Sequence, residues 1–128
     1  MLQQSISGLL DLMSNGRIFD SVDIFYTKKA DDAKNEARNL QPGDVDVVLA
    51  IGGDGTLHEV VNGMMEGGCG SALSILPAGT VNDFGTYMKI PTDPGQYLDM
   101  LLNFKTRPID IGKSNDRYFL NVAAGGML

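Results

Sequence analysis

Apolar residues in the first part of the chain recur with a helical period, then with a strand period, and then with a helical period again. Leucine, isoleucine and methionine fall three or four residues apart over 2–13, which predicts a helix that ends at Asn15-Gly16. Alternating residues over 22–26 predict a strand. Alanines at helical spacing over 30–40 predict a short second helix, which the Gln41-Pro42-Gly43 turn ends.

The next segment has the pattern of a strand-helix-strand unit. Residues 45–51 are almost continuously apolar, as expected for a parallel strand that is covered on both faces. Apolar residues then follow a helical stripe over 57–65, and Thr56 with Glu59 three residues later predicts a capping box at the start of this helix. A second buried strand is predicted over 72–76, with a right-handed crossover between the two strands.

The last part of the chain predicts two helices and a hairpin. A short helical stretch is expected over 83–88, and Asp93-Pro94 opens a longer helix that extends to Phe104. Two alternating runs, 109–112 and 118–122, flank a polar turn and predict a β-hairpin. The order of elements predicts an α/β fold: a three-layer, mainly parallel sheet with helices on both faces and a C-terminal β-hairpin.

Composition restricts the function classes. The chain has 128 residues, enough for one domain, and its net charge of −6 argues against binding nucleic acid or an anionic membrane through broad charge attraction. A phosphate ligand must therefore be held locally. The single cysteine, Cys69, excludes an internal disulfide, and the absence of a long apolar run argues against a transmembrane helix. A reducing cytosol is the expected compartment.

The strongest chemical signal is the sequence Gly52-Gly53-Asp54-Gly55-Thr56, between a buried strand and a helix. Open α/β sheets bind ligands at this position, and glycines there allow backbone N–H groups to converge on an anion beside the positive end of the helix dipole. A nucleotide phosphate fits this description. The loop has neither the third glycine of the dinucleotide fingerprint nor the Lys-Ser/Thr of a P-loop.

Asp54 in this loop has two interpretations. A carboxylate would repel a phosphate unless a magnesium ion lies between them or the carboxylate orients a substrate hydroxyl. Alternatively, Asp54 simply caps a turn. His58 is equally open, either as a phosphate ligand or as a solvated imidazole on the polar side of the helix.

A second polar cluster follows the second predicted strand, in Leu76-Pro77-Ala78-Gly79-Thr80-Val81-Asn82-Asp83-Phe84. Parallel strands end at the same edge of a sheet, so Thr80 and Asp83 are expected to face Asp54 across one cleft. Asp110 is a third acidic residue, and by itself its position between two isoleucines indicates only a side chain that points outwards.

These motifs together resemble the diacylglycerol kinase catalytic family, which includes bacterial lipid kinases and sphingosine kinases. The first glycine loop with Glu59, Val60, Asn62 and Gly63 is similar to the phosphate loop and helix of that family. The 76–84 segment is similar to its second motif, and Asp110-x-Gly112 with Tyr118-Phe119-x-Asn121 to its third. The first motif also occurs in NAD kinases and phosphofructokinases, whereas the second is much more specific to lipid kinases.

The resemblance implies a role for each motif residue. The nucleotide ATP would be bound by Thr27, Gly52, Gly53, Asp54, Gly55, Thr56, His58 and Thr80. The catalytic acids would be Asp54, Asp83 and Asp110, which would hold Mg²⁺ through water. Phosphoryl transfer depends mainly on positioning and charge neutralisation, which such a site supplies.

The family also implies segments that this sequence does not contain. Its members usually begin with a strand that ends in an Asn-Pro-x-x-Gly turn, and they continue into a β-sandwich domain with the lipid pocket and the general base. Residues 1–128 are therefore expected to be a fragment, the nucleotide-binding domain of a lipid kinase, and to be inactive alone. Two further departures are His58, where asparagine is frequent, and Gly85-Thr86, where Ala-Arg is commoner.

The resulting hypothesis is an ATP- and magnesium-dependent lipid kinase that phosphorylates the hydroxyl of diacylglycerol or a similar lipid. Such an enzyme would be cytoplasmic and peripheral to the membrane, where the absent domain would meet its lipid substrate. Exposed sheet edges leave association into a homo-oligomer open. Two alternatives are a kinase of NAD or another soluble alcohol, and a non-catalytic nucleotide-binding or regulatory module.

Overall fold

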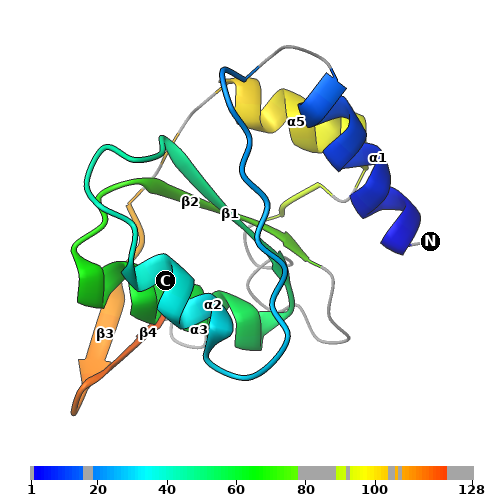
Figure 1. The fold of residues 1–128 in the computed structure, drawn as a ribbon. Coiled ribbons are helices and arrows are strands. Elements are labelled where there is room, and N and C mark those ends of the chain that lie inside the picture. The colour runs from blue at the N-terminus through cyan, green and yellow to red at the C-terminus, as the bar shows by residue number, and fades with distance from the viewer. Residues whose placement is uncertain are drawn as a thin grey trace.

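The computed structural model describes residues 2–15, 19–77, 89–91, 93–103, 106 and 108–120. Within these ranges the chain forms a parallel strand pair, four helices around it, and an antiparallel hairpin (Figure 1). The elements are α1 (Leu2–Asn15), α2 (Asp32–Arg38), β1 (Val47–Gly52), α3 (Asp54–Gly67), β2 (Ala72–Pro77), α5 (Pro94–Asn103), β3 (Ile111–Ser114) and β4 (Arg117–Leu120).

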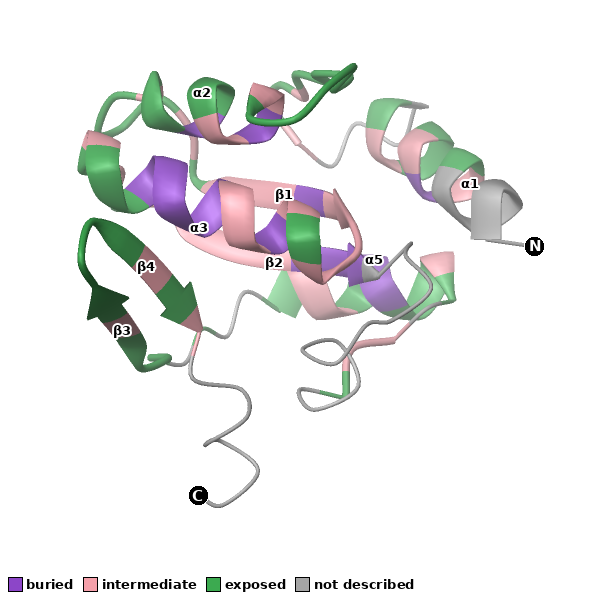
Figure 2. Ribbon diagram, turned by 90° about the horizontal axis from the view of Figure 1, so that it is seen from below, coloured by how far each residue is buried: buried purple, intermediate pink, exposed green. Residues whose placement is uncertain are grey.

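The two central strands separate two groups of helices. Alternate side chains of β1 point to opposite faces: Val48 and Ala50 pack with α2 and α3, whereas Leu49 and Ile51 pack with α1 and α5. Figures 1 and 2 show the same arrangement, with α2 and α3 on one side of the strands and α1 and α5 on the other. The continuous apolar run of β1 is explained by this burial on both faces, as the sequence predicts.

The α1 and α5 side contains the most deeply buried side chains. Leu9 of α1 and Tyr97 of α5 are both fully buried. The hydroxyl of Tyr97 shares a 2.6 Å hydrogen bond with the hydroxyl of Ser74 on β2. Burial raises the pKa of Tyr97 well above its ordinary value, and the Ser74 hydrogen bond opposes this shift only in part. Tyr97 is therefore protonated at any physiological pH.

The opposite layer is built by a close approach of α2 and α3. A Cβ atom added at Gly63 would overlap the carbonyl oxygen of Lys34 and lie 2.8 Å from Cβ of Ala37. A Cβ atom at Gly67 would meet the carbonyl group of Arg38 in the same way. The two glycines of α3 thus let the backbone of α2 lie directly on it, and Figure 2 shows α3 as the most buried helix of this layer.

The segment before α2 differs from its prediction. Residues 21–28 form no strand, although apolar and polar residues alternate there. Ile24, Phe25 and Tyr26 are 46%, 53% and 72% exposed, and β1 has β2 as its only hydrogen-bonded neighbour among the described residues. An alternating pattern makes a strand only where a neighbouring strand accepts its backbone hydrogen bonds, and the described chain supplies none here.

The other predicted elements agree closely with the structure. The helices at 2–13 and 30–40, the two parallel strands and the helix after Asp93 are all present, and the hairpin is displaced by about two residues from the predicted runs. Its two-residue turn is Asn115-Asp116, with Asn115 in a left-handed conformation at φ 56. The stretch predicted as helical at 83–88 lies outside the described residues. None of the described helices has the length and apolar character needed to cross a membrane.

Candidate functional site

The glycine loop connects the carboxyl end of β1 to the first turn of α3. Gly52 is the last residue of β1, and Gly53 is the extended residue that precedes the helix, with φ −95 and ψ −166. The first helical hydrogen bond runs from the Leu57 N–H to the Gly53 carbonyl oxygen, at 3.1 Å. The N–H groups of Gly55 and Thr56 therefore have no acceptor inside the helix, which is the arrangement that favours an anion.

The predicted capping box at Thr56 and Glu59 is wrong. The helix begins two residues earlier, at Asp54, and its N-cap, Gly53, has no side chain with which to cap it. The side chain of Thr56 instead lies against the end of β1, because a Cβ atom at Gly52 would be only 2.6 Å from Thr56 Oγ1. Glycine is needed at position 52 for space, whereas at Gly55 the corresponding position has no neighbour within 4 Å. Gly55 thus leaves open space beside the first turn.

Both motif-bearing loops leave the sheet at the same edge. β1 and β2 are parallel and in register, and Gly52 at the end of β1 pairs with Pro77 at the end of β2. The glycine loop and the second motif therefore start side by side, as the sequence predicts from strand direction. Thr80 and Asp83 of the second motif lie outside the described residues.

The other predicted site residues occupy separate elements. Asp54 is the first residue of α3 and is half-buried, whereas Asp110 is exposed immediately before β3. Thr27 is exposed in the extended segment before α2. Within the described ranges, which exclude Asp83, no three His, Cys, Asp or Glu side chains cluster as a metal site would require.

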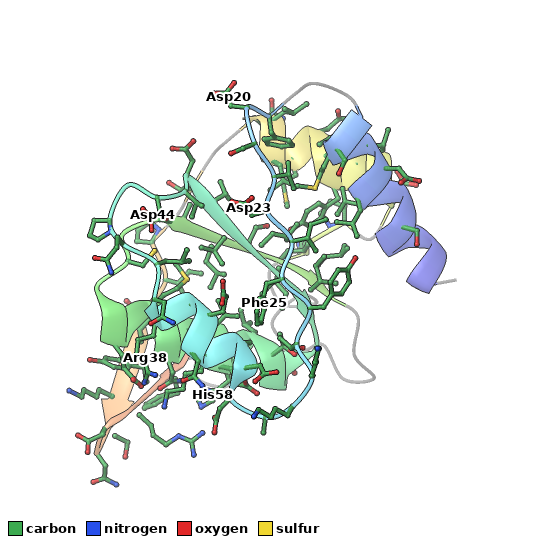
Figure 3. The ribbon with its side chains drawn as sticks, viewed as in Figure 1. Asp20, Asp23, Phe25, Arg38, Asp44 and His58 are labelled. Carbon is green, nitrogen blue, oxygen red and sulfur yellow. The ribbon has the colours of Figure 1, made fainter. Side chains whose placement is uncertain are left out.

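His58 lies in a groove where α2, α3 and β4 meet. The groove has a volume of about 280 Å³. Its lining is strongly polar and of mixed charge, and consists of Asp31, Lys34, His58, Glu59, Asn62 and Arg117. His58 is one helical turn beyond Asp54 and Gly55, so its side chain lies on the same face of α3 as the start of the helix. Figure 3 shows His58 close to the segment that enters α2.

Asn62 holds the hairpin against α3 at the bottom of this groove. Its side-chain amide donates to the carbonyl oxygens of His58 and Tyr118, both at 2.8 Å, and its side-chain oxygen accepts the Tyr118 N–H at 2.7 Å. Asn62 is only 4% exposed, and every polar atom of its side chain is used. The neighbouring Arg117 reaches His58 with a 3.0 Å hydrogen bond between its Nη2 and the His58 Nε2.

The segment that enters α2 is fixed by a carboxylate rather than by a helix cap. Asp32 accepts the backbone N–H groups of Lys28 at 2.8 Å and Lys29 at 3.1 Å. The Lys28 hydrogen bond is the main reason why the pKa of Asp32 is below its ordinary value. Asp31, in a left-handed conformation at φ 70, makes no side-chain cap and instead lines the groove. Of the acidic pair, Asp32 thus ties the entering segment to α2, and Asp31 contributes to the groove.

Sequence reasoning did not assign a function to four of the groove residues, namely Asp31, Lys34, Asn62 and Arg117. One signal was present: Asn62 follows His58 by four residues on a helix and therefore shares its face. Arg117 gives no such signal, because 59 residues separate it from His58.

The sequence of this chain matches one known protein family over most of its length. The model of the family described as "Diacylglycerol kinase catalytic domain" matches residues 4–114. The chain belongs to this family. The resemblance that the sequence motifs carry is thereby confirmed.

Named relatives and solved structures agree with this membership. A diacylglycerol kinase of Staphylococcus haemolyticus is 46% identical over 104 residues, which are 81% of this chain and 32% of the relative. A diacylglycerol kinase of Staphylococcus aureus is 47% identical over 104 residues, and the matched part is 33% of that relative. A crystal structure of a diacylglycerol kinase from Bacillus anthracis matches 91% of this chain and 40% of its own, with a TM-score of 0.79 and 26% identity. The chain thus spans about a third of the length of these curated relatives.

Proposed function

We propose that this chain is the nucleotide-binding part of an ATP- and magnesium-dependent lipid kinase that phosphorylates the hydroxyl of diacylglycerol or a similar lipid. The observation that carries the proposal is the start of α3, where Gly55 and Thr56 present unpaired helix N–H groups at the same sheet edge as the second family motif. In the complete protein, the parallel pair would form the centre of a larger, mainly parallel sheet, with helices on both faces as the other two layers.

The phosphates of ATP would lie on the first turn of α3. The loop residues Gly52, Gly53, Gly55 and Thr56 would contact them, because amide groups at a helix N-terminus bind anions without a large opposing desolvation cost. His58, one turn further on, would contact the same phosphates, and Thr27 and Thr80 would complete the nucleotide contacts. The chain has a net charge of −6, so these local donors would have to hold the ligand.

Asp54, Asp83 and Asp110 would hold Mg²⁺ through its water molecules. Their oxygen ligands fit this ion, which keeps several waters and prefers one or two carboxylates together with substrate phosphates. When bound, Mg²⁺ would neutralise charge on the phosphates. The half-buried Asp54 lies directly beside the proposed phosphate-binding amides. With Mg²⁺ and its water molecules in between, the carboxylate would orient the phosphates and would not repel them.

In the reaction, the lipid hydroxyl oxygen would form a bond to the γ-phosphorus, and the bond from that phosphorus to the β,γ-bridging oxygen would break to release ADP. The hydroxyl proton would pass to a general base outside this chain. The remaining two-thirds of the length of the relatives would supply this base and the lipid pocket. The enzyme would be cytoplasmic and peripheral to the membrane.

Titration of the chain with Mg-ATP tests the nucleotide part of the proposal. We expect saturable binding by the chain alone, without transfer of phosphate to diacylglycerol in vesicles. A folded chain that does not bind Mg-ATP would contradict the proposal. Binding that persists without transfer after extension to the length of the relatives would favour a non-catalytic module.

Substitution of Asp54 tests its role in the extended protein. Asp54→Asn keeps the size and most hydrogen-bonding capacity of the side chain but removes its charge. We expect turnover to fall by at least about 100-fold, since charge stabilisation contributes on this scale, while the melting temperature changes little. Unchanged turnover would mean that Asp54 only shapes the turn. A parallel assay with NAD in place of diacylglycerol distinguishes the soluble-alcohol alternative.

A further inference from the structure

The hairpin brings a cation to the nucleotide side of α3. Arg117 is exposed at the start of β4, and its guanidinium lies 3.0 Å from His58 Nε2. No ion pair is found for Arg117 within the described part of the chain. Its one described hydrogen-bond partner is His58, a residue that the proposed function assigns to the phosphates.

This contact determines which tautomer a neutral His58 ring adopts. A guanidinium can only donate hydrogen bonds, so Nε2 of His58 must be the acceptor and cannot carry a proton. The ring proton of the neutral imidazole is then on Nδ1, which remains able to donate to a ligand. An unrestrained histidine favours the opposite tautomer, with the proton on Nε2. Arg117 thus selects the form of His58 that presents Nδ1–H.

Both partners of this contact are held by the same buried side chain. Asn62 binds the carbonyl oxygen of His58 and both backbone groups of Tyr118, the residue next to Arg117. Because Asn62 is 4% exposed and fully hydrogen-bonded, the hairpin and helix cannot slide without leaving buried polar groups unpaired. The backbones that carry His58 and Arg117 are therefore held in one register, which keeps the two side chains within reach of each other.

The groove that these residues line has the donor and acceptor pattern of a nucleoside phosphate site. Lys34, Arg117 and His58 supply donors for phosphate, and the carboxylates of Asp31 and Glu59 supply acceptors for ribose or base N–H and O–H groups. Lys34 is paired with Glu66 at 3.1 Å, whereas Arg117 contacts His58 directly.

We propose that Arg117 is a nucleotide-positioning residue, which holds His58 as its Nδ1–H tautomer and places a positive charge beside the phosphates of Mg-ATP. The inference rests on the proposed function and extends it: nucleotide binding by α3 requires the β3-β4 hairpin. A residue of the third motif segment, 59 positions away, would then contribute to the first.

The tautomer is measurable without any nucleotide. His58 is the only histidine in the chain, so its imidazole nitrogens give unambiguous signals in long-range ¹H–¹⁵N NMR spectra. In the neutral ring we expect the Nδ1–H form in the wild type and a shift toward the Nε2–H form in Arg117→Ala. Lys113→Ala is the matched control, because it removes a cation from the same hairpin, where Lys113 lies over the Tyr118 ring and outside the groove. Identical ring spectra for wild type and Arg117→Ala would overturn the proposal.

Mg-ATP titration measures the consequence for binding. A charge-assisted contact of this kind is worth roughly a tenfold change in Kd, which we expect for Arg117→Ala. Lys113→Ala should stay within about twofold of wild type, since an exposed charge outside the groove is strongly screened. His58→Ala should weaken binding similarly, and the double variant should lose much less than the sum of both, because the two residues act together.

The outcomes separate this inference from the proposed function. A wild-type chain that binds Mg-ATP as tightly as Arg117→Ala would overturn the role of Arg117 and leave the proposed function standing. A folded wild type with no affinity for Mg-ATP would overturn both. Circular dichroism checks the fold of each variant. If Arg117→Ala does not fold, Arg117→Lys takes its place. Because lysine keeps the positive charge beside His58, this variant should retain more than half of the Mg-ATP binding free energy that is attributed to Arg117. A larger loss would contradict the role of the charge.

Discussion

The two partners of α3 are attached to it by different physical means. On the side of α2, contact depends on missing side chains, because Gly63 and Gly67 let the backbones meet. On the side of the hairpin, Tyr118 and Leu120 pack on the apolar cluster that contains Leu57 and Val61. The polar contact there is one buried amide, Asn62, which makes two hydrogen bonds to the backbone of Tyr118. The first interface should therefore be intolerant of added volume, and the second intolerant of the loss of one polar group.

Gly63→Ala tests the first half of this comparison and should have the largest effect. The added Cβ would overlap the backbone of Lys34, which cannot rotate away, so we expect a loss of about 3 kcal/mol in the free energy of unfolding. Urea denaturation measures it. Gly70→Ala is the control, since a Cβ atom there has no neighbour within 4 Å and should change stability little. Equal stability of the Gly63 variant and the wild type would mean that the helices do not pack this closely.

Asn62→Ala tests the second half. The variant leaves the backbone groups of Tyr118 without their partner, and we expect a loss of about 2 kcal/mol. Hydrogen exchange gives a local measurement as well, because the Tyr118 amide should lose its protection before the amides of β1 and β2. Asn103→Ala, at an exposed position of α5, controls for the removal of an asparagine. Retained protection at Tyr118 would mean that the apolar packing of Tyr118 and Leu120 holds the hairpin without Asn62.

Gly112→Ala sharpens the comparison with Gly63. A Cβ atom at Gly112 would lie 2.5 Å from Cε2 of Phe119, which is as severe a clash by distance. Phe119 is 41% exposed, however, so its ring can rotate into solvent, and we expect a loss of only about 1 kcal/mol. Urea denaturation of both glycine variants under one set of conditions provides the measurement. A cost at Gly112 equal to that at Gly63 would show that the ring of Phe119 is fixed.

Asp32→Asn should have the smallest effect, and one that depends on pH. The pKa of Asp32 is lowered in the folded state, first by the Lys28 N–H hydrogen bond, so its charge stabilises the fold above the pKa of the unfolded chain. This contribution is lost as pH falls through the folded pKa. Melting curves should therefore place the variant below the wild type at pH 7, with the difference shrinking in acid. If the difference in melting temperature persists unchanged below the folded-state pKa of Asp32, the charge of Asp32 does not contribute, and the effect comes from the altered shape of the side chain.

The sequence predicted the local elements well because their signals are local. The unbroken apolar run of β1, the spacing of apolar residues in α3 and the Asn115-Asp116 turn each lie within a few neighbouring residues. The predicted strand at 22–26 failed because an alternating pattern specifies which residues share a face, and a hydrogen-bonded neighbour must come from elsewhere in the fold. The capping box failed for a related reason: the pattern fits, but the glycine loop allows the helix to begin earlier.

The candidate site divides along the same line. By itself, the sequence determined the glycine loop, the common sheet edge and the family, because motif spacing and strand direction are properties of the chain order. Only the tertiary structure decided that Arg117 meets His58 and that Asn62 serves both, since no local pattern encodes a contact between residues 59 positions apart. Such contacts depend on how the hairpin packs on α3, which the whole fold fixes.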